Sequence, residues 1–375
     1  AICVVLLIDV FLRPEQRQVT YLLAMLSLVG VAIVSIVAAV QQPSVTFSGS
    51  FIADPAGGAL KLIAYIVVAL VFLYSRNYLE EQDLFKGEFF VLTLFGLLGI
   101  MVMISANSML TMYLGLELLS LSLYALVAFN RESAIAAESA MKYFVLGAIA
   151  SGCLLYGISL LYGVTGTLEF SGLAAGLAGG RGLSLAAALG LVFIVVGVAF
   201  KFGAVPFHMW APDVYDGAST PVTLLLGSLP KIAAFGLAMR ILIEGMGPLA
   251  EHWSMMLVIL SVLSMVLGNI VAIAQGSSEL NISFVVEEAQ AADAAICDTA
   301  LVVKSGDTTT PGRSMISEIT FCARVWSVLP LLSSLTVCAI ESARSSAERA
   351  LRLPEKPASA LASGVSNHCS SPPVS

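Results

Sequence analysis

The chain has 375 residues, of which 58% are hydrophobic and only 11% are charged, and its mean hydropathy is +0.94. A soluble protein of this length would need many more charged residues on its surface, so the composition excludes that class. The net charge of −7 gives no indication of nucleic-acid binding. Apolar runs of about 17 to 25 residues recur, and each is long enough to cross a bilayer as a helix. The sequence therefore predicts an all-α polytopic membrane protein.

Nine apolar segments are predicted along the chain. They cover residues 1–12 (a partial helix), 20–40, 59–75, 89–106, 108–128, 138–162, 184–205, 218–240 and 254–274. Because the chain starts at Ala1 inside an apolar run, we expect its true N-terminus to lie upstream. The glycine-rich stretch GLAAGLAGGRG (172–182) follows no predicted strand, so we interpret it as a flexible loop and not as a dinucleotide-binding motif.

Basic residues in the connections predict how the chain is oriented. The connections after the first, third and fifth segments carry Arg13, Arg17, Arg76, Lys86 and Arg131, whereas the opposite set carries Arg181 and Arg240. Loops rich in lysine and arginine face the cytoplasm, so we assign the first set to that side. Arg240 ends the eighth segment and is interpreted as an anchor at the membrane interface. Lys142 lies near the start of the sixth segment and is expected to extend its ammonium toward water.

The character of the chain changes after Gln275, where serine becomes frequent. The one apolar run that follows, at 323–340, contains Arg324 and Pro330, so a tenth span there is the less favoured alternative. We therefore divide it into a membrane domain of about nine helices (1–275) and an atypical polar tail (276–375) that is disordered or derived from a frameshift. The six cysteines form no CxxC pair, so the sequence predicts neither a zinc nor an iron–sulfur site.

Three charged residues lie inside predicted spans, namely Glu117, Lys201 and Lys231. Glu117 is nine residues from the start of its segment, roughly 14 Å along a helix, which is too deep for its short side chain to reach water. A charge at the bilayer centre costs about 2.5–3.5 kcal/mol on insertion scales, and such residues usually face a protein interior or a hydrated cavity. A structural ion pair that locks two helices is the alternative interpretation, open for Glu117 and Lys231.

The surroundings of these charges favour a hydrated polar path. Tyr113, Glu117, Ser120 and Tyr124 share one helix face by their spacing, and Lys201 is followed at once by Gly203 and Pro206. Pro230, next to Lys231, frees a backbone carbonyl within the membrane, and broken helices can hold water at that depth. A buried lysine can release its proton because desolvation disfavours the ammonium, whereas arginine stays charged. The pattern therefore predicts proton transfer.

Four stretches carry a resemblance to a known family. YLGLELLSLSLYAL, ESAMKYFVLGAIASGCLLYG, KFGAVPFHMWAPDVYDGASTPV and PKIAAF are similar to the antiporter-like, proton-translocating membrane subunits of NADH-quinone oxidoreductase, respiratory complex I. The resemblance covers residues 1–275. It implies two inverted five-helix repeats, each with a broken helix and a half-channel, joined by a central axis of charged residues. It also implies that Glu117, Lys201 and Lys231 translocate protons and that His208 helps link the path to the cytoplasmic side.

The resemblance has further implications for partners and location. It implies a chain that binds no cofactor itself, in a bacterial inner membrane, beside membrane subunits of a complex whose other subunits bind NADH, FMN, iron–sulfur clusters and quinone. Nothing in 276–375 matches the family pattern, so the second repeat is expected to be truncated. A cation/proton antiporter subunit and a non-functional remnant remain the alternative interpretations.

Overall fold

The structure is a computed structural model that describes residues 1–13, 16–39, 44–179 and 184–274. Its helices and strands are α1 (Ile2–Phe11), α2 (Arg17–Ala39), β1 (Ser44–Thr46), β2 (Phe51–Ala53), α3 (Pro55–Glu81), α4 (Gly87–Ile104), α5 (Met109–Val127), α6 (Ala134–Thr165), α7 (Phe170–Ala178), α8 (Leu185–Phe202), α9 (Ala211–Gly217), α10 (Thr220–Ala238), a π-helical turn η2 (Met239–Gly245), a 3₁₀ turn η3 (Gly247–Leu249) and α11 (Ala250–Ala274). Eight of the described helices or continuous helical stretches are long and apolar enough to cross a membrane. The prediction of a polytopic helical membrane protein is confirmed.

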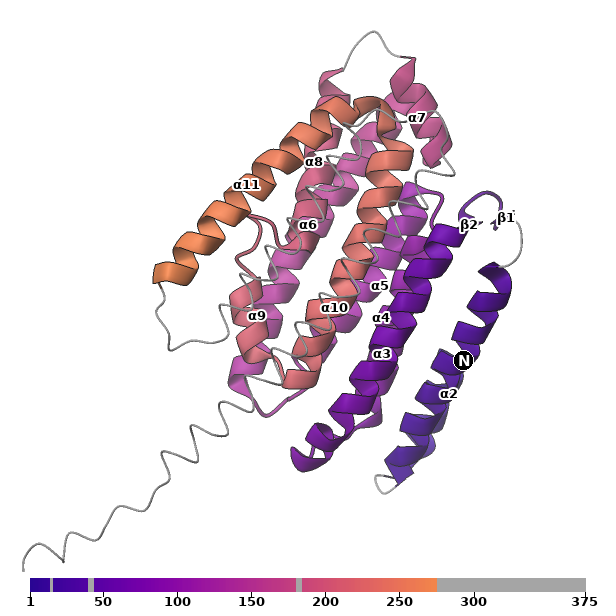
Figure 1. Cartoon of the computed structure of the whole chain (residues 1–375), viewed down its shortest axis with the longest axis vertical. Helices are drawn as coiled ribbons and strands as arrows, with labels where there is room; N and C mark the ends of the chain where they lie inside the picture. The colour runs from indigo at the N-terminus through magenta and orange to yellow at the C-terminus, as the bar shows by residue number, and fades with distance from the viewer. Residues whose placement is uncertain (14–15, 40–43, 180–183, 275–375) are drawn as a thin grey trace, which may run out of the picture. The chain divides into compact units, whose positions relative to one another are not determined.

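Helices α4, α5, α6, α8, α9 and α10 lie together in the central part of the bundle (Figure 1). The closest packing joins α4 to α5 and α6 to α8. Between α4 and α5, a Cβ atom on Gly115 would lie 2.7 Å from the carbonyl oxygen of Gly99, so no larger side chain fits. Small residues let membrane helices approach closely, and here they fix the α5 face that bears Glu117 and Ser120.

Two differences from the sequence expectations have clear physical causes. Residues 172–178, expected to form a loop, belong to α7. Alanine and leucine favour a helix, and Phe170 and Leu173 are buried, with Phe170 at the start of α7 close to Gly245 of η2. The eighth segment does not end at Arg240 either, because α10 continues as the π-helical turn η2 to Gly245. The predicted polar tail lies outside the described residues.

A short hairpin precedes α3. Strands β1 and β2 pair antiparallel, with Val45 opposite Ile52. The backbone amide of Ile52 donates to the carbonyl of Ser105, which caps the end of α4. The hairpin thus joins the beginning of α3 to the end of α4 at one end of the bundle.

Candidate functional site: a broken helix with two lysines

The predicted break beside Lys201 is present. Helix α8 ends at Phe202, and Gly203 follows in the left-handed region with φ 74° and ψ 26°, a conformation that glycine adopts without strain. Residues 203–210 form turns, and the helical path resumes in α9 at Ala211. Helices α8 and α9 both pack on α6, so together they follow one neighbour with an interruption between them.

The interrupting segment is held from several sides. The indole Nε1 of Trp210 donates to the carbonyl of Phe200 at 3.3 Å, and its ring stacks on Tyr143 of α6 with centroids 4.8 Å apart. The amide of Val205 donates to Ser264 Oγ of α11 at 2.8 Å. The two hydrogen bonds satisfy backbone groups that a broken helix would otherwise leave unpaired in the membrane.

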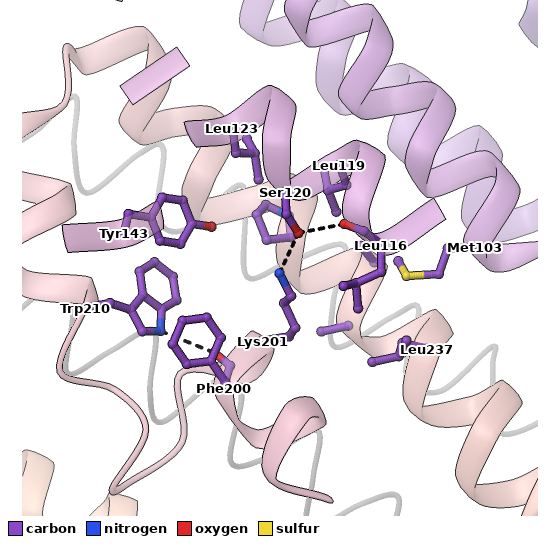
Figure 2. A pocket seen from close by; sticks show the side chains of 13 residues that line it. Met103, Leu116, Leu119, Ser120, Leu123, Tyr143, Phe200, Lys201, Trp210 and Leu237 are labelled. Carbon is purple, nitrogen blue, oxygen red and sulfur yellow. Dashed lines mark hydrogen bonds between the residues drawn. The ribbon is translucent and has the colours of Figure 1, made fainter. Parts of the chain in front are cut away.

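Lys201 is bound by a neutral partner. Its Nζ donates to Ser120 Oγ on α5 at 2.6 Å, and Ser120 in turn donates to the carbonyl of Leu116 at 2.6 Å (Figure 2). Ser120 is almost fully buried. The expected polar face of α5 therefore does point at the lysine of the broken helix, across 81 residues of sequence.

A small cavity lies beside this contact. Thirteen residues line it: Met103, Leu116, Leu119, Ser120, Leu123, Tyr143, Phe200, Lys201, Trp210, Pro230, Ala233, Ala234 and Leu237 (Figure 2). The space open to the centre of a water molecule is about 10 Å³, close to the minimum that one water requires. Lys201 and Ser120 supply polar partners on a lining that is otherwise mostly apolar.

Glu117 lies one helical turn from Ser120 on α5, and its charge acts on Lys201. The side chain also interacts with Tyr113. Its Oε1 is buried and, among the described residues, has no hydrogen-bond partner. A buried acceptor without a partner is costly, so this oxygen is a place where a proton or a water would bind favourably.

Lys231 of α10 also contacts the broken helix. Its Nζ donates to the carbonyl of Phe202, the last residue of α8, at 2.8 Å. The carbonyl ends of a helix carry partial negative charge, so the ammonium is stabilised there. Pro230 lies directly before it inside α10. The sequence predicted Lys201 and Lys231 in one path, and the structure brings both to the end of α8.

His208 lies within the interrupting segment and does not line the cavity beside Lys201. Burial lowers its pKa below the ordinary value of 6.5, and a hydrogen bond to the carbonyl of Pro206 opposes that shift only in part. Its Nδ1 is buried and has no partner within the described ranges. The imidazole is thus predominantly neutral at pH 7, with one nitrogen free to accept a proton.

A second charged cluster lies where α3 begins and α4 ends, and the sequence did not indicate it. Arg240 donates from Nε to the carbonyl of Ile104 at 2.9 Å, from Nη1 to Glu244 at 2.6 Å and from Nη2 to Asp54 at 2.5 Å. Its side chain is 6% exposed. The interpretation of Arg240 as an interface anchor was therefore wrong, because its side chain is buried and two of its three partners, Ile104 and Asp54, come from distant parts of the chain. Lys61, close by, donates to Ser105 Oγ.

Lys142 is exposed, but it lies more than two turns inside α6, which begins at Ala134, and its ammonium pairs with Asp213 at 2.7 Å and Glu138 at 3.0 Å. For metal binding, the described residues contain no group of three or more histidine, cysteine, aspartate or glutamate side chains placed to hold an ion.

Comparison with known proteins finds a family model that matches part of the chain, and a consistent fold. Residues 106–281 match the model of the NADH:quinone oxidoreductase/Mrp antiporter transmembrane family. NADH-quinone oxidoreductase subunit N of Thioalkalivibrio sulfidiphilus is 55% identical over 274 residues, which are 73% of this chain and 57% of that protein. The Nitrosomonas europaea protein of the same name is 54% identical, with the same coverage. The chain thus spans just over half the length of these relatives.

Two solved structures share the fold. Respiratory complex I from Thermus thermophilus contains a chain that matches with a TM-score of 0.64 and 28% identity, covering 88% of this chain and 68% of that one. A chain of the Mrp complex from Dietzia sp. matches with a TM-score of 0.66 and 16% identity, over 80% of this chain and 57% of that one, which supports the fold alone. The chain therefore has the antiporter-like membrane fold, and its sequence is similar to subunit N of NADH-quinone oxidoreductase.

Proposed function

We propose that this chain is a proton-translocating membrane subunit of NADH:quinone oxidoreductase. The observation that carries this proposal is the binding of Lys201 beside the helix break. Its ammonium donates to a serine hydroxyl next to a cavity about the size of one water, while the carboxylate of Glu117 acts on it without a direct bond in the described part of the chain. A lysine bound by neutral groups keeps its hydrogen bond whether it is charged or not, so it can exchange a proton.

In this proposal each residue has a distinct role. The N–H bond of the Lys201 ammonium breaks, its electron pair stays on Nζ, and the proton passes to a water. Glu117 favours the charged form of Lys201, so any change that moves or protonates Glu117 releases that proton. Lys231 of α10, whose Nζ contacts the end of α8, is the next proton-carrying group. Its hydrogen bond connects the helix break to α10 beside Pro230. His208 links the path to the cytoplasmic side through its free Nδ1.

The proposed activity belongs to an assembly. The chain would act as part of an enzyme whose partner subunits bind NADH, FMN, iron–sulfur clusters and quinone, while this chain itself binds no cofactor. Its location would be the bacterial inner membrane, as a multi-pass subunit beside other membrane subunits of complex I. Redox energy would then arrive as a conformational or electrostatic change at its surface.

The proposed division of the chain is a membrane domain (1–275) and a separate tail (276–375). The similarity to the subunit N relatives over 274 residues supports the first part. Because the second repeat of the family is not recognisable in 276–375, a non-functional remnant is a competing proposal. The nucleotide sequence across codons 270–285 tests whether the tail comes from a frameshift. If another reading frame encodes the apolar runs that 276–375 lacks, a frameshift is supported. If no frame encodes them, a frameshift is contradicted.

A cation/proton antiporter subunit is the second candidate, favoured by the Mrp antiporter in the description of the matching family. Purification of the complex from its own membranes separates the two. A complex I subunit copurifies with NADH dehydrogenase activity, and NADH oxidation acidifies everted vesicles that contain it. An antiporter subunit instead copurifies without that activity, and the vesicles exchange sodium or potassium for protons.

A further inference from the structure

We propose that Lys61 is a second proton-exchanging lysine, at the end of the bundle that holds Asp54, Arg240 and Glu244. The inference rests on the proposed proton-translocating function and assigns it a further site. Lys61 lies six residues into α3 from Pro55, about 9 Å from the start of the helix. By the charge of its connections, this end faces away from the cytoplasm.

Lys61 contacts a hydroxyl group and an aromatic ring. Its Nζ donates to Ser105 Oγ at the end of α4 and lies 5.1 Å from the ring centre of Phe51. Both partners are neutral. Lys201 is bound in the same manner, by Ser120 Oγ with Phe200 nearby. Within the described residues these are the two lysines that donate to a serine hydroxyl, whereas Lys142 pairs with carboxylates.

The carboxylates near Lys61 are already paired with Arg240. Asp54 acts electrostatically on Lys61 but forms its ion pair with Arg240, at 2.5 Å. Glu244 pairs with Arg240 at 2.6 Å. The charged groups that act on Lys61 are therefore Asp54, the N-cap residue of α3, and Arg240 from η2. In the described part of the chain, the hydrogen-bond partner of Lys61 is the neutral Ser105 at the end of α4.

The charge balance of the cluster and its exposure also favour Lys61 as the group that exchanges a proton. With all four groups ionised, Lys61 and Arg240 cancel Asp54 and Glu244, and the loss of one proton from Lys61 changes the cluster by a single charge. Arginine cannot release a proton, so Lys61 is the cation that can change. The side chains of Asp54 and Glu244 are 16% and 28% exposed, and Asp54 lies at the N-terminal end of α3, so the cluster is open at this end of the bundle. Arg240 and Glu244 lie on a π-helical turn, a rare element found often at functional sites.

In the proposed step, the Lys61 ammonium releases a proton to water, which becomes hydronium, and the electron pair of the broken N–H bond stays on Nζ. Uptake reverses the step. The cluster would thereby connect the proton path of α10 to the face of the membrane opposite the cytoplasm.

The test compares Lys61→Gln and Lys61→Arg in the assembled complex, in everted membrane vesicles. The quantity measured is the number of protons pumped per NADH oxidised, normalised to the amount of assembled complex. Both variants should lower this ratio, because neither side chain exchanges a proton. If Lys61 only stabilises the structure through its charge, Lys61→Arg restores the wild-type ratio, and that result overturns the proposal. Lys86→Gln, in the connection before α4, is the control and should keep the ratio.

Two further variants make every outcome decisive. If the Lys61 variants do not assemble, Ser105→Ala keeps the charge and removes only the hydroxyl partner. A lower ratio supports the proposal, and a wild-type ratio overturns it. Lys201→Gln is measured in parallel. Loss of pumping in Lys201→Gln together with full pumping in Lys61→Arg refutes the Lys61 site alone, whereas full pumping in Lys201→Gln refutes the proposed function.

Discussion

The two lysines at the helix break and Arg240 with its carboxylates are bound in opposite ways. At the break, Lys201 and Lys231 donate to a hydroxyl and to a backbone carbonyl, at 2.6 and 2.8 Å. Around Arg240, the guanidinium bonds directly to two carboxylates, at 2.5 and 2.6 Å. A direct ion pair fixes both charges, because neutralising one partner leaves the other uncompensated. Neutral partners leave the charge of a lysine free to change, so the difference separates structural charges from those suited to carry protons.

The strongest test of the structural side of this comparison is Arg240→Ala. The substitution leaves the carboxylates of Asp54 and Glu244 without their partner, and breaking a buried pair in this way costs about 3–5 kcal/mol. We expect a large drop in the thermal unfolding temperature of the detergent-solubilised complex. The matched control is Arg131→Ala, whose ion pair with Glu88 is exposed and worth at most about 1 kcal/mol. Equal decreases of the unfolding temperature in the two variants would contradict the structural role of the Arg240 ion pairs.

A smaller loss of stability is expected for Gly115→Ala, which tests how α5 is positioned. The new Cβ would lie 2.7 Å from backbone atoms of α4, so the helices must separate and carry Ser120 away from Lys201. Overpacking of this kind costs about 1–3 kcal/mol. Gly152→Ala is the control, because a Cβ there meets nothing within 4 Å. Both stability and pumping should fall in Gly115→Ala alone, and unchanged pumping would mean that the contact between α4 and α5 does not position the site.

The smallest expected effect is the contribution of His208 to the pH dependence of the free energy of unfolding. Burial lowers its pKa below 6.5, so the unfolded chain binds a proton more readily than the folded chain. The free energy of unfolding must then decrease as the pH falls from 6.5 through the lower pKa of the folded state. Thermal unfolding between pH 7 and 5 should show a shallower pH dependence in His208→Gln than in the wild type. Substitution of the exposed His252 by glutamine is the control, and a wild-type slope in His208→Gln would contradict a lowered pKa for the half-buried imidazole of His208.

The sequence predicted what depends on local pattern. Apolar length identified the spans, and Gly203 beside Lys201 identified the break, because both signals lie within a few residues. The spacing of Glu117 and Ser120 placed them on one helix face. The partner of Arg240 could not be predicted, since Asp54 lies 186 residues away and only the packing of α3 against α10 brings them together.

Other features depended on context in the same way. Lys231 was expected from its depth in a span, but its contact with the carbonyl of Phe202 follows from where α8 stops. Lys61 was missed because a lysine near a helix end usually extends to water, and nothing in the local sequence indicates that Ser105 lies beside it. Helix α7 was missed because its glycines suggested a loop, while the contact with η2 is tertiary.

The central claim is that Lys201 changes its charge during turnover, and Lys201→Arg tests it most directly. Arginine keeps the positive charge and can still donate to Ser120, but it cannot release a proton. The measurement is NADH-driven proton uptake by everted vesicles at equal amounts of assembled complex. The account predicts that pumping falls at least about tenfold, since a positioned acid–base group contributes ~10²–10⁴ to the rate of proton transfer. Wild-type pumping in Lys201→Arg would contradict it.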